Sequence, residues 1–224
     1  MDMRIISKEE VIKTLATSET SVEFRDTVFR HMDLSDISFE DVFFSNCCFE
    51  YCKMNDTDFR RSTLEKVTFT FCDMVRIVFD WSHFHRFCFD KCRIDHCYFP
   101  YSVFKHGGFT DCEFISCDIT NEHQVDVSYT RGILQNMTYE YSTLIDVTYF
   151  NTVLDHVNYE CTDGTHVVFD EVVLRNTDPD PLGEDNFIVF GGFDQVQEKT
   201  KKEFAVHLLV DTDGNAAVTL SEEV

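Results

Sequence analysis

Large apolar residues recur at every fifth position between Phe24 and Leu174. The residue at this position is Phe, Leu, Met, Ile or Tyr at all but two of the 31 steps, which are Gln124 and Gly164. A second column, two residues earlier, holds mainly small or β-branched residues such as Cys47. A helix, with a period of about 3.6 residues, and a flat strand, with a period of about 2, both fail to give this spacing. We therefore expect each pentad to be a short extended piece with two inward side chains and a bend, so that the chain coils on itself.

This arrangement resembles the pentapeptide-repeat family, whose motif has a central Leu or Phe, a small residue two positions earlier and polar residues elsewhere. The resemblance covers about two thirds of the 224 residues. It implies an all-β fold, a right-handed four-sided β-helix in which four pentads form each coil. The small column holds Cys more often than Ala here, which changes the interior volume but not the period.

Residues 1–21 are expected to form an N-terminal cap. Ser7 and Glu10 have the spacing of a capping box, and Val11, Ile12 and Leu15 supply an apolar stripe over the next turns. A short helix here would cover the first coil, whose core and strand edges would otherwise face water.

We expect the β-helix to occupy residues 22–175 and a separate C-terminal segment to occupy residues 176–224. A turn-rich stretch at 176–183 begins this segment. Residues 187–193, 204–210 and 216–220 are predicted to be strands, the last two forming a hairpin, and 196–203 a short helix. The segment could cap the last coil, pair with a second copy or hold a partner. In the pentapeptide-repeat family such an element often mediates dimerisation, so the resemblance favours a homodimer.

Stacking the pentads at twenty-residue intervals predicts aromatic ladders inside the coil, such as Phe29, Phe49 and Phe69. Gln124 and Gly164 both fall on one of the four faces. Their position predicts a local bulge or bend on that face, with a ligand pocket as the alternative.

Cysteine use and hydropathy suggest a compartment. Seven of the ten cysteines lie in the small inward column, where a thiol packs as a compact hydrophobe, whereas Cys48, Cys88 and Cys161 should be more exposed. No run approaches the ~18 apolar residues that a membrane span needs, and the first residues lack the pattern of a secretory signal. We expect a soluble, cytoplasmic protein with no membrane partner.

Motifs for catalysis are missing from the sequence. It contains no Gly-rich phosphate loop, no GxSxG and no HExxH. His83 and His85 flank an inward Phe and could share a metal, but solvated surface histidines are the favoured interpretation. The repeat has no insertion that would supply the loops on which enzymes usually carry their chemistry. We predict a non-enzymatic protein without cofactor or metal.

The formal charge of −22 points to the class of partner. Residues 22–175 contain 26 acidic and 13 basic residues, a net charge of −13. With coils ~4.8 Å apart they form a rod of roughly 37 Å, over which duplex DNA would carry about 22 charges. This balance disfavours direct nucleic-acid binding and favours imitation of DNA. The candidate acidic positions are Asp36, Asp41, Asp56, Asp111, Asp126, Asp146 and Glu171.

Outward aromatic residues form a second surface feature. Trp81 and Tyr101 lie one coil apart in a single column, and exposed aromatics beside Arg are typical of protein-binding hot spots. Stacking that only shields the backbone of the coil is an equal alternative. The candidate partner-binding residues are Trp81, Tyr101, Arg61, Phe43, Tyr51 and Phe71.

Two hypotheses of function remain open. The first is an acidic DNA mimic that inhibits or decoys a DNA-acting protein, for which type II topoisomerase (gyrase) is the best precedent among the family that the chain resembles. The second is a scaffold or recognition domain that binds a protein partner through its aromatic columns, with charge serving solubility.

Overall fold

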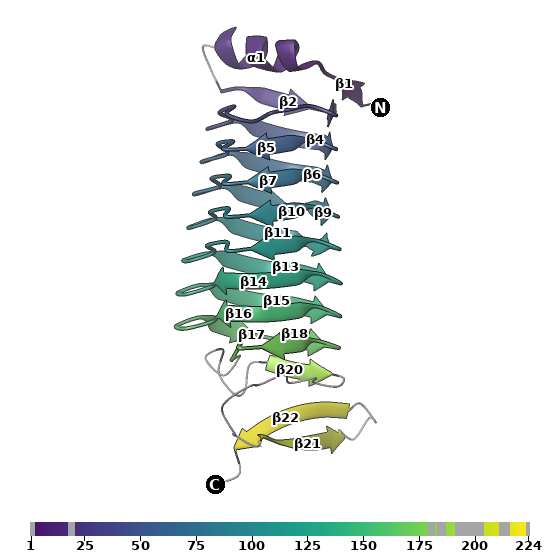
Figure 1. Cartoon of the computed structure of the whole chain (residues 1–224), viewed down its shortest axis with the longest axis vertical. Coiled ribbons are helices and arrows are strands. Elements are labelled where there is room, and N and C mark those ends of the chain that lie inside the picture. Colours follow the sequence, from purple (N-terminus) through teal and green to yellow (C-terminus); the bar gives the residue numbers. More distant parts are fainter. Residues whose placement is uncertain are drawn as a thin grey trace.

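The computed structural model describes residues 3–17, 21–178 and 182, and the backbone of three further strands at 187–190, 204–210 and 216–222. Strands stack along one long axis beneath the helix α1 (Lys8–Thr17), as Figure 1 shows. The fold is a right-handed four-sided β-helix, as the resemblance implied.

Two sheets run along this axis, and their strands pair in parallel with the strand one coil away until the last hairpin. The register shift is twenty residues, as in the pairing of Phe44 with Leu64. The larger sheet contains β1 (Arg4–Ile5), β2 (Glu23–Arg25), β3 (Thr27–Arg30), β4 (Phe43–Glu50), β6 (Thr63–Thr70), β8 (His83–His85), β9 (Cys88–Asp90), β11 (Val103–Thr110), β13 (His123–Thr130), β15 (Thr143–Phe150), β17 (Asp163–Thr165), β18 (Val167–Asp170), β20 (Phe187–Phe190), β21 (Phe204–Val210) and β22 (Ala216–Glu222). The smaller sheet contains β5 (Lys53–Asn55), β7 (Asp73–Val75), β10 (Arg93–Asp95), β12 (Glu113–Ile115), β14 (Ile133–Thr138), β16 (Val153–Asn158) and β19 (Val173–Arg175).

The bend after each pentad is a left-handed backbone conformation. Thirty-one non-glycine residues, each two positions after a central residue, have φ between 47° and 61°, from Asp26 to Asn176. We call these the corner residues. Asn, Asp and His tolerate this conformation better than most side chains, and 17 of the 31 corners carry one of them. The polar character of this position therefore serves the backbone as well as solubility.

Ladders of side chains fill the interior. The rings of Phe29 and Phe49 stack with centroids 4.4 Å apart, and those of Phe49 and Phe69 stack at 4.7 Å, so the predicted aromatic ladder is confirmed. In the small column a thiol or hydroxyl donates to the backbone of the preceding coil, as Ser82 Oγ does to the Phe59 carbonyl at 2.7 Å. These thiols and hydroxyls are thereby satisfied, whereas the carboxyl of Glu122 in the same column has no hydrogen-bond partner among the described residues. All ten cysteines are free thiols, and Cys161 is exposed as predicted.

The N-terminal helix begins with the predicted capping box. The Ser7 amide donates to Glu10 Oε2 at 3.0 Å, and the Glu10 amide donates to Ser7 Oγ at 3.2 Å. Val11 is fully buried against the first coils, but Ile12 is 49% exposed, so the predicted apolar stripe is wrong at that position. Ile6, which precedes the helix, is buried in the core and supplies the apolar side chain that was expected from Ile12.

The bulge predicted at Gln124 and Gly164 is wrong. Gln124 pairs in register with Phe104 and Leu144, and Gly164 pairs in register with Leu144. A Cβ on Gly164 would lie 3.2 Å from the Cβ of Leu182, which is buried. A side chain from beyond the repeat therefore fills the space that a large central residue would occupy.

The C-terminal segment continues the larger sheet. β20 pairs in parallel with β18 and antiparallel with β22, and β21 and β22 form the predicted antiparallel hairpin. The helix predicted at 196–203 lies outside the described residues. Among the described residues, no helix is long and apolar enough to cross a membrane.

Candidate protein-binding surface

One of the four corners forms a hydrogen-bonded turn in most coils. At this corner, which we call the Trp81 corner, the amides of Ser62, Ser82 and Ser102 donate to the carbonyls three residues earlier at 3.0 to 3.1 Å. With a positive φ at the third residue, each is arranged as a type II turn. These turns project from the left side of the stack in Figure 1. The residues of this corner are Asp41, Arg61, Trp81, Tyr101, Asn121, Tyr141 and Cys161.

Trp81 and Tyr101 stack on each other at this corner. Their ring centroids lie 4.6 Å apart with planes 13° from parallel, although Trp81 is 56% exposed and Tyr101 46%. Tyr141 and Tyr98 are also exposed. Arg61, one coil before Trp81, is engaged with the preceding coil, where it donates to both carboxylate oxygens of Asp41 at 2.9 and 2.8 Å.

The other predicted aromatic residues lie elsewhere. Tyr51 and Phe71 stack at 5.0 Å on the corner opposite Trp81, where the ladder extends to His31. The opposite placement follows from their positions, two pentads away in a coil of four. Phe43 is half-buried on another face, 5.7 Å from the Arg25 guanidinium. The structure thus brings together Trp81 and Tyr101 but separates both from Phe43, Tyr51 and Phe71.

The seven predicted acidic residues are all corner residues, spread over all four corners. Three of them form two-pronged ion pairs with an Arg one coil away, and the guanidinium holds the pKa of each carboxyl below its usual value. Asp126 and Asp146 hydrogen-bond with His106 and His166. Local partners therefore counter much of this predicted acidity. The three Arg pairs are Asp41 with Arg61, Asp56 with Arg76, and Asp111 with Arg131.

Sequence reasoning missed a more acidic surface beside the Trp81 corner. The surface consists of the Trp81 corner and the outward residues of the face that precedes it. It contains seven acidic and two basic side chains, a net charge of −5. The other three faces with their corners carry −2 or −3. We call this surface the acidic aromatic face. Counting charge along the chain hides it, but sorting outward residues at twenty-residue intervals would have found it. Its acidic residues are Glu40, Asp41, Asp58, Asp80, Asp118, Glu140 and Glu160.

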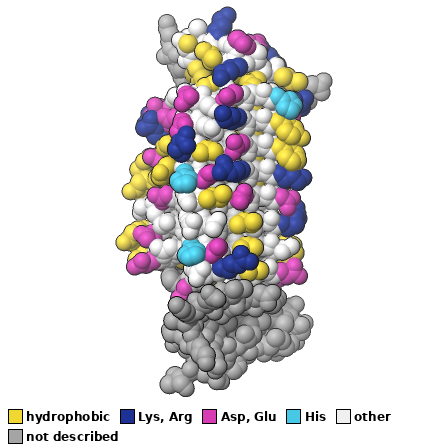
Figure 2. All heavy atoms as spheres, in the orientation of Figure 1, with side chains coloured by type: hydrophobic (Ala, Val, Ile, Leu, Met, Phe, Trp, Pro, Cys, Tyr) yellow, Lys and Arg dark blue, Asp and Glu magenta, His cyan; other side chains and the backbone are white. Residues whose placement is uncertain are grey.

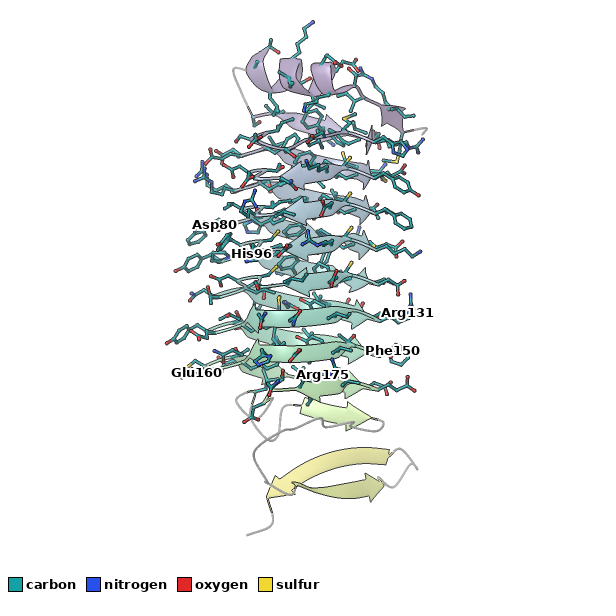
Figure 3. All side chains as sticks on the ribbon, in the orientation of Figure 1. Asp80, His96, Arg131, Phe150, Glu160 and Arg175 are labelled. Atoms are coloured by element: carbon teal, nitrogen blue, oxygen red, sulfur yellow. The ribbon has the colours of Figure 1, made fainter. Side chains whose placement is uncertain are left out.

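Beyond Arg61 the acidic aromatic face has no Lys or Arg through Cys161. Asp80 and Glu160 lie on the left of Figure 3, opposite Arg131. Acidic and hydrophobic side chains line the same edge in Figure 2, whereas signs alternate up the centre of that view. The negative charge therefore persists along one side of the rod.

Asp80 is a partly dehydrated carboxyl of this face. Burial raises its pKa, and the negative charges of Asp58 and Asp118 add to the shift, against the opposing effect of an Arg. Its Oδ1 is buried and accepts no hydrogen bond from the described residues. Asp80 immediately precedes Trp81, so a partly dehydrated carboxylate lies in the same turn as an exposed indole. Such a pair suits a partner that offers Lys or Arg, because cations bind both carboxylates and aromatic faces.

Comparisons with known proteins agree with this architecture. The family model for pentapeptide repeats matches residues 23–61 and 44–80. No curated protein matches the sequence. A trypsin-treated variant of QnrB1, a plasmid-mediated fluoroquinolone resistance protein, is similar in fold, with 15% identity, a TM-score of 0.54, and coverage of 87% of this chain and 89% of that one. The pentapeptide repeat protein Rfr23 from the cyanobacterium Cyanothece 51142 shares 10% identity, with a TM-score of 0.46 and coverage of 65% and 99%. The five-residue period and the stacked coils extend beyond the residues that the family model matches, so the chain is similar to pentapeptide-repeat proteins over the whole of residues 24–174.

Proposed function

We propose that this protein is a non-enzymatic binding protein whose acidic aromatic face occupies the DNA-binding groove of a DNA-acting protein. The observation that carries the proposal is that this face has four acidic residues and no Lys or Arg from Asp80 to Glu160, beside the exposed stack of Trp81 and Tyr101. A groove that binds duplex DNA is rich in Lys and Arg. The carboxylates of the acidic aromatic face can form ion pairs with these Lys and Arg side chains, and its exposed rings can stack on them.

Charge on its own falls short of imitating DNA. Asp80, Asp118, Glu140 and Glu160 are four charges over five coils, which span about 24 Å at ~4.8 Å per coil. Duplex DNA carries about 14 charges over that length. The aromatic stack must therefore contribute affinity that the carboxylates cannot, and both parts of the face belong to the binding surface.

The first partner to test is a type II topoisomerase. QnrB1 is a fluoroquinolone resistance protein with the same fold, and topoisomerase inhibition is the precedent among pentapeptide-repeat proteins. The chain would act as an inhibitor or decoy without binding nucleic acid itself. We expect it to do so in the cytoplasm, and a homodimer formed through the C-terminal segment is part of the proposal.

The test measures displacement of a labelled DNA duplex from purified type II topoisomerase by fluorescence anisotropy. One variant removes three charges from the acidic aromatic face, with Asp118→Asn, Glu140→Gln and Glu160→Gln. The matched control removes three charges from other corners, with Asp126→Asn, Asp146→Asn and Glu171→Gln. We expect the first to weaken displacement by about tenfold or more and the control by less than about threefold, with affinity falling steeply as salt rises.

The competing function is recognition of a protein partner through the aromatic stack alone. The exposure of Trp81 and Tyr101 favours it, because both rings remain open to a partner while stacked. The discriminating variant is Trp81→Asn, with Tyr51→Asn at the opposite corner as its control. If Trp81→Asn abolishes binding while salt and the three charge changes do not, recognition through the aromatic stack replaces mimicry. Failure to displace DNA at low salt would reject the topoisomerase proposal.

A further inference from the structure

Most Lys and Arg residues of the β-helix form ion pairs with carboxylates. Three of those that do not lie close together. Residues 22–175 contain 13 Lys and Arg residues. Eight have a carboxylate oxygen within 4.0 Å. Three of the other five, Lys66, Arg86 and Lys105, lie on one face in adjacent coils. The five cations of this range without such a partner among the described residues are Lys53, Lys66, Arg86, Lys105 and Arg175.

Strand register places the three cations together. His85 pairs with Glu65 in one neighbouring coil and with Lys105 in the other. Lys66 and Arg86 are the corner residues that follow Glu65 and His85, and both are exposed. At ~4.8 Å per coil the three positively charged side chains span about 10 Å along the axis.

Two histidines lie beside these cations and form hydrogen bonds with neighbouring carboxylates. The Glu65 carboxylate hydrogen-bonds with His85 Nδ1, and the Asp126 carboxylate hydrogen-bonds with His106 Nδ1 at 3.0 Å. The imidazoles of His85 and His106 pack edge to face at 5.3 Å. Both carboxylates therefore bind imidazoles in place of the cations beside them. We call Lys66, His85, Arg86, Lys105 and His106 the cationic patch.

We propose that the cationic patch binds an acidic segment of a protein partner, one rich in Asp and Glu. The side chains of Lys66, Arg86 and Lys105 are exposed, and a single exposed ion pair contributes little binding free energy. A single small anion would therefore bind weakly, whereas one polymer that engages several cations at once would gain from each. An extended acidic peptide presents alternate side chains about 6.6 Å apart on one side, a spacing that two or three of these cations can meet.

Nucleic acid fits the cationic patch less well than an acidic peptide does. The chain carries a net charge of −22, which repels a long and densely charged polyanion. A short peptide brings only the few charges that the patch neutralises, and its neutral backbone faces the rest of the protein. The matched partner is therefore protein in nature.

The patch lies on the face that follows the Trp81 corner, and the acidic aromatic face lies on the face that precedes it. Surfaces of opposite charge thus flank a single row of turns. The inference is independent of the proposed function, because the cationic patch shares no residue with the acidic aromatic face. A partner that contacted both would need a basic surface and an acidic surface on either side of a ridge.

The test uses a fluorescein-labelled ten-residue peptide with glutamates at three alternate positions and neutral residues elsewhere, titrated with the full-length protein at low salt and followed by anisotropy. The variant Lys66→Asn with Arg86→Asn removes two patch cations, and Asn already occupies five other corners. The matched control, Arg76→Asn with Arg131→Asn, removes two corner cations that are paired with carboxylates. Both variants change the net charge equally, and thermal unfolding checks that each remains folded.

We expect the wild type to bind the peptide, the patch variant to lose about fivefold or more in affinity, and the control to lose less than about twofold. A single-stranded DNA decamer with the same label should bind more weakly than the peptide. The proposal is overturned if the peptide does not bind at low salt. It is equally overturned if the two variants weaken binding to the same degree, or if the DNA decamer binds more tightly than the peptide.

Discussion

The ring of Phe87 occupies the space that a side chain at Gly107, one coil away, would need. A Cβ on Gly107 would lie 2.4 Å from the Phe87 carbonyl oxygen and 2.5 Å from its Cδ1 atom. Both residues belong to the small inward column, in which Val67 and Val127 are the next members on either side. The bulk of Phe87 and the missing side chain of Gly107 thus compensate each other within one stack.

This relationship predicts strong coupling between the two positions. Gly107→Val should destabilise the protein by about 3 kcal/mol or more, because the new side chain meets both ring and backbone, and Phe87→Val should cost about 1 to 3 kcal/mol through the cavity left behind. The double variant should lose clearly less than the sum, since the smaller side chain lets the coil readjust. Urea denaturation of all four proteins measures the coupling, and additive free energies would contradict it.

Because Glu122 is buried, we expect the free energy of unfolding to fall as the pH rises. It is buried in the inward column, where the residues at the same place in other coils include Ser82, Ser102 and Ser142, and neither carboxyl oxygen has a hydrogen-bond partner among the described residues. Burial raises its pKa well above the ordinary value, and Gln124 opposes the shift. The unfolded chain therefore releases this proton at lower pH than the folded protein does. Above the ordinary pKa of 4.5, stability should fall by about 1.4 kcal/mol per pH unit until the folded carboxyl ionises.

Glu122→Ser tests this dependence, because it restores the residue of the neighbouring coils. The variant should be more stable than the wild type by about 2 kcal/mol or more near neutral pH, with a larger gain at about pH 8 than at about pH 5. Glu122→Gln is the control, since it removes the titration but keeps a buried polar group. Thermal unfolding across this pH range measures both. A difference between Glu122→Ser and the wild type that stays constant with pH would contradict the assignment.

The left-handed corners predict which outward substitutions the coil tolerates. Asn136 has φ of 54° and an exposed side chain. Asn136→Val should destabilise the protein by about 1 to 2 kcal/mol, because a β-branched side chain clashes with its own backbone in this conformation, whereas Asn136→Gly should be nearly neutral. The neighbouring Gln135→Val is the control, since Gln135 lies in β14 without a positive φ. Equal losses of free energy of unfolding for the two Val variants would show that strain at the corner is not the cause.

The capping box predicts local opening at the N-terminal end. Ser7→Ala removes the acceptor of the Glu10 amide and should cost about 1 kcal/mol, measured as faster amide exchange in α1 and in the first strands it covers. The backbone hydrogen bond from Ser7 lowers the pKa of Glu10, so the cap should hold above the ordinary Glu pKa and weaken as the pH falls through the folded value. Unchanged exchange in the first strands would mean that α1 does not protect them.

Sequence alone determined the inside of this protein. A central residue and a small residue two positions earlier recur in every pentad, and four pentads form one coil. Residues twenty positions apart in the sequence therefore lie one coil apart along the axis. The sequence therefore predicts that Phe29 and Phe49 lie in one ladder. The capping box and the final hairpin were equally predictable, because each depends on residues within a few positions of one another. The left-handed corners and the packing of Leu182 against Gly164 were not predictable in this way, because both depend on how the bent chain closes.

Only the tertiary structure decided the surface. Long outward side chains can reach a neighbour two residues away or one coil away, and the period of the sequence does not distinguish the two. Arg60 bonds Asp58, two residues before it, whereas the adjacent Arg61 bonds Asp41, twenty residues before it. The ion pairs that form determine which charges are neutralised and which remain unpaired. They therefore determine where the acidic aromatic face and the cationic patch lie. The physical reason is that inward positions are fixed by packing, while outward ones are fixed by rotamers and by electrostatic neighbours that only the closed coil brings together.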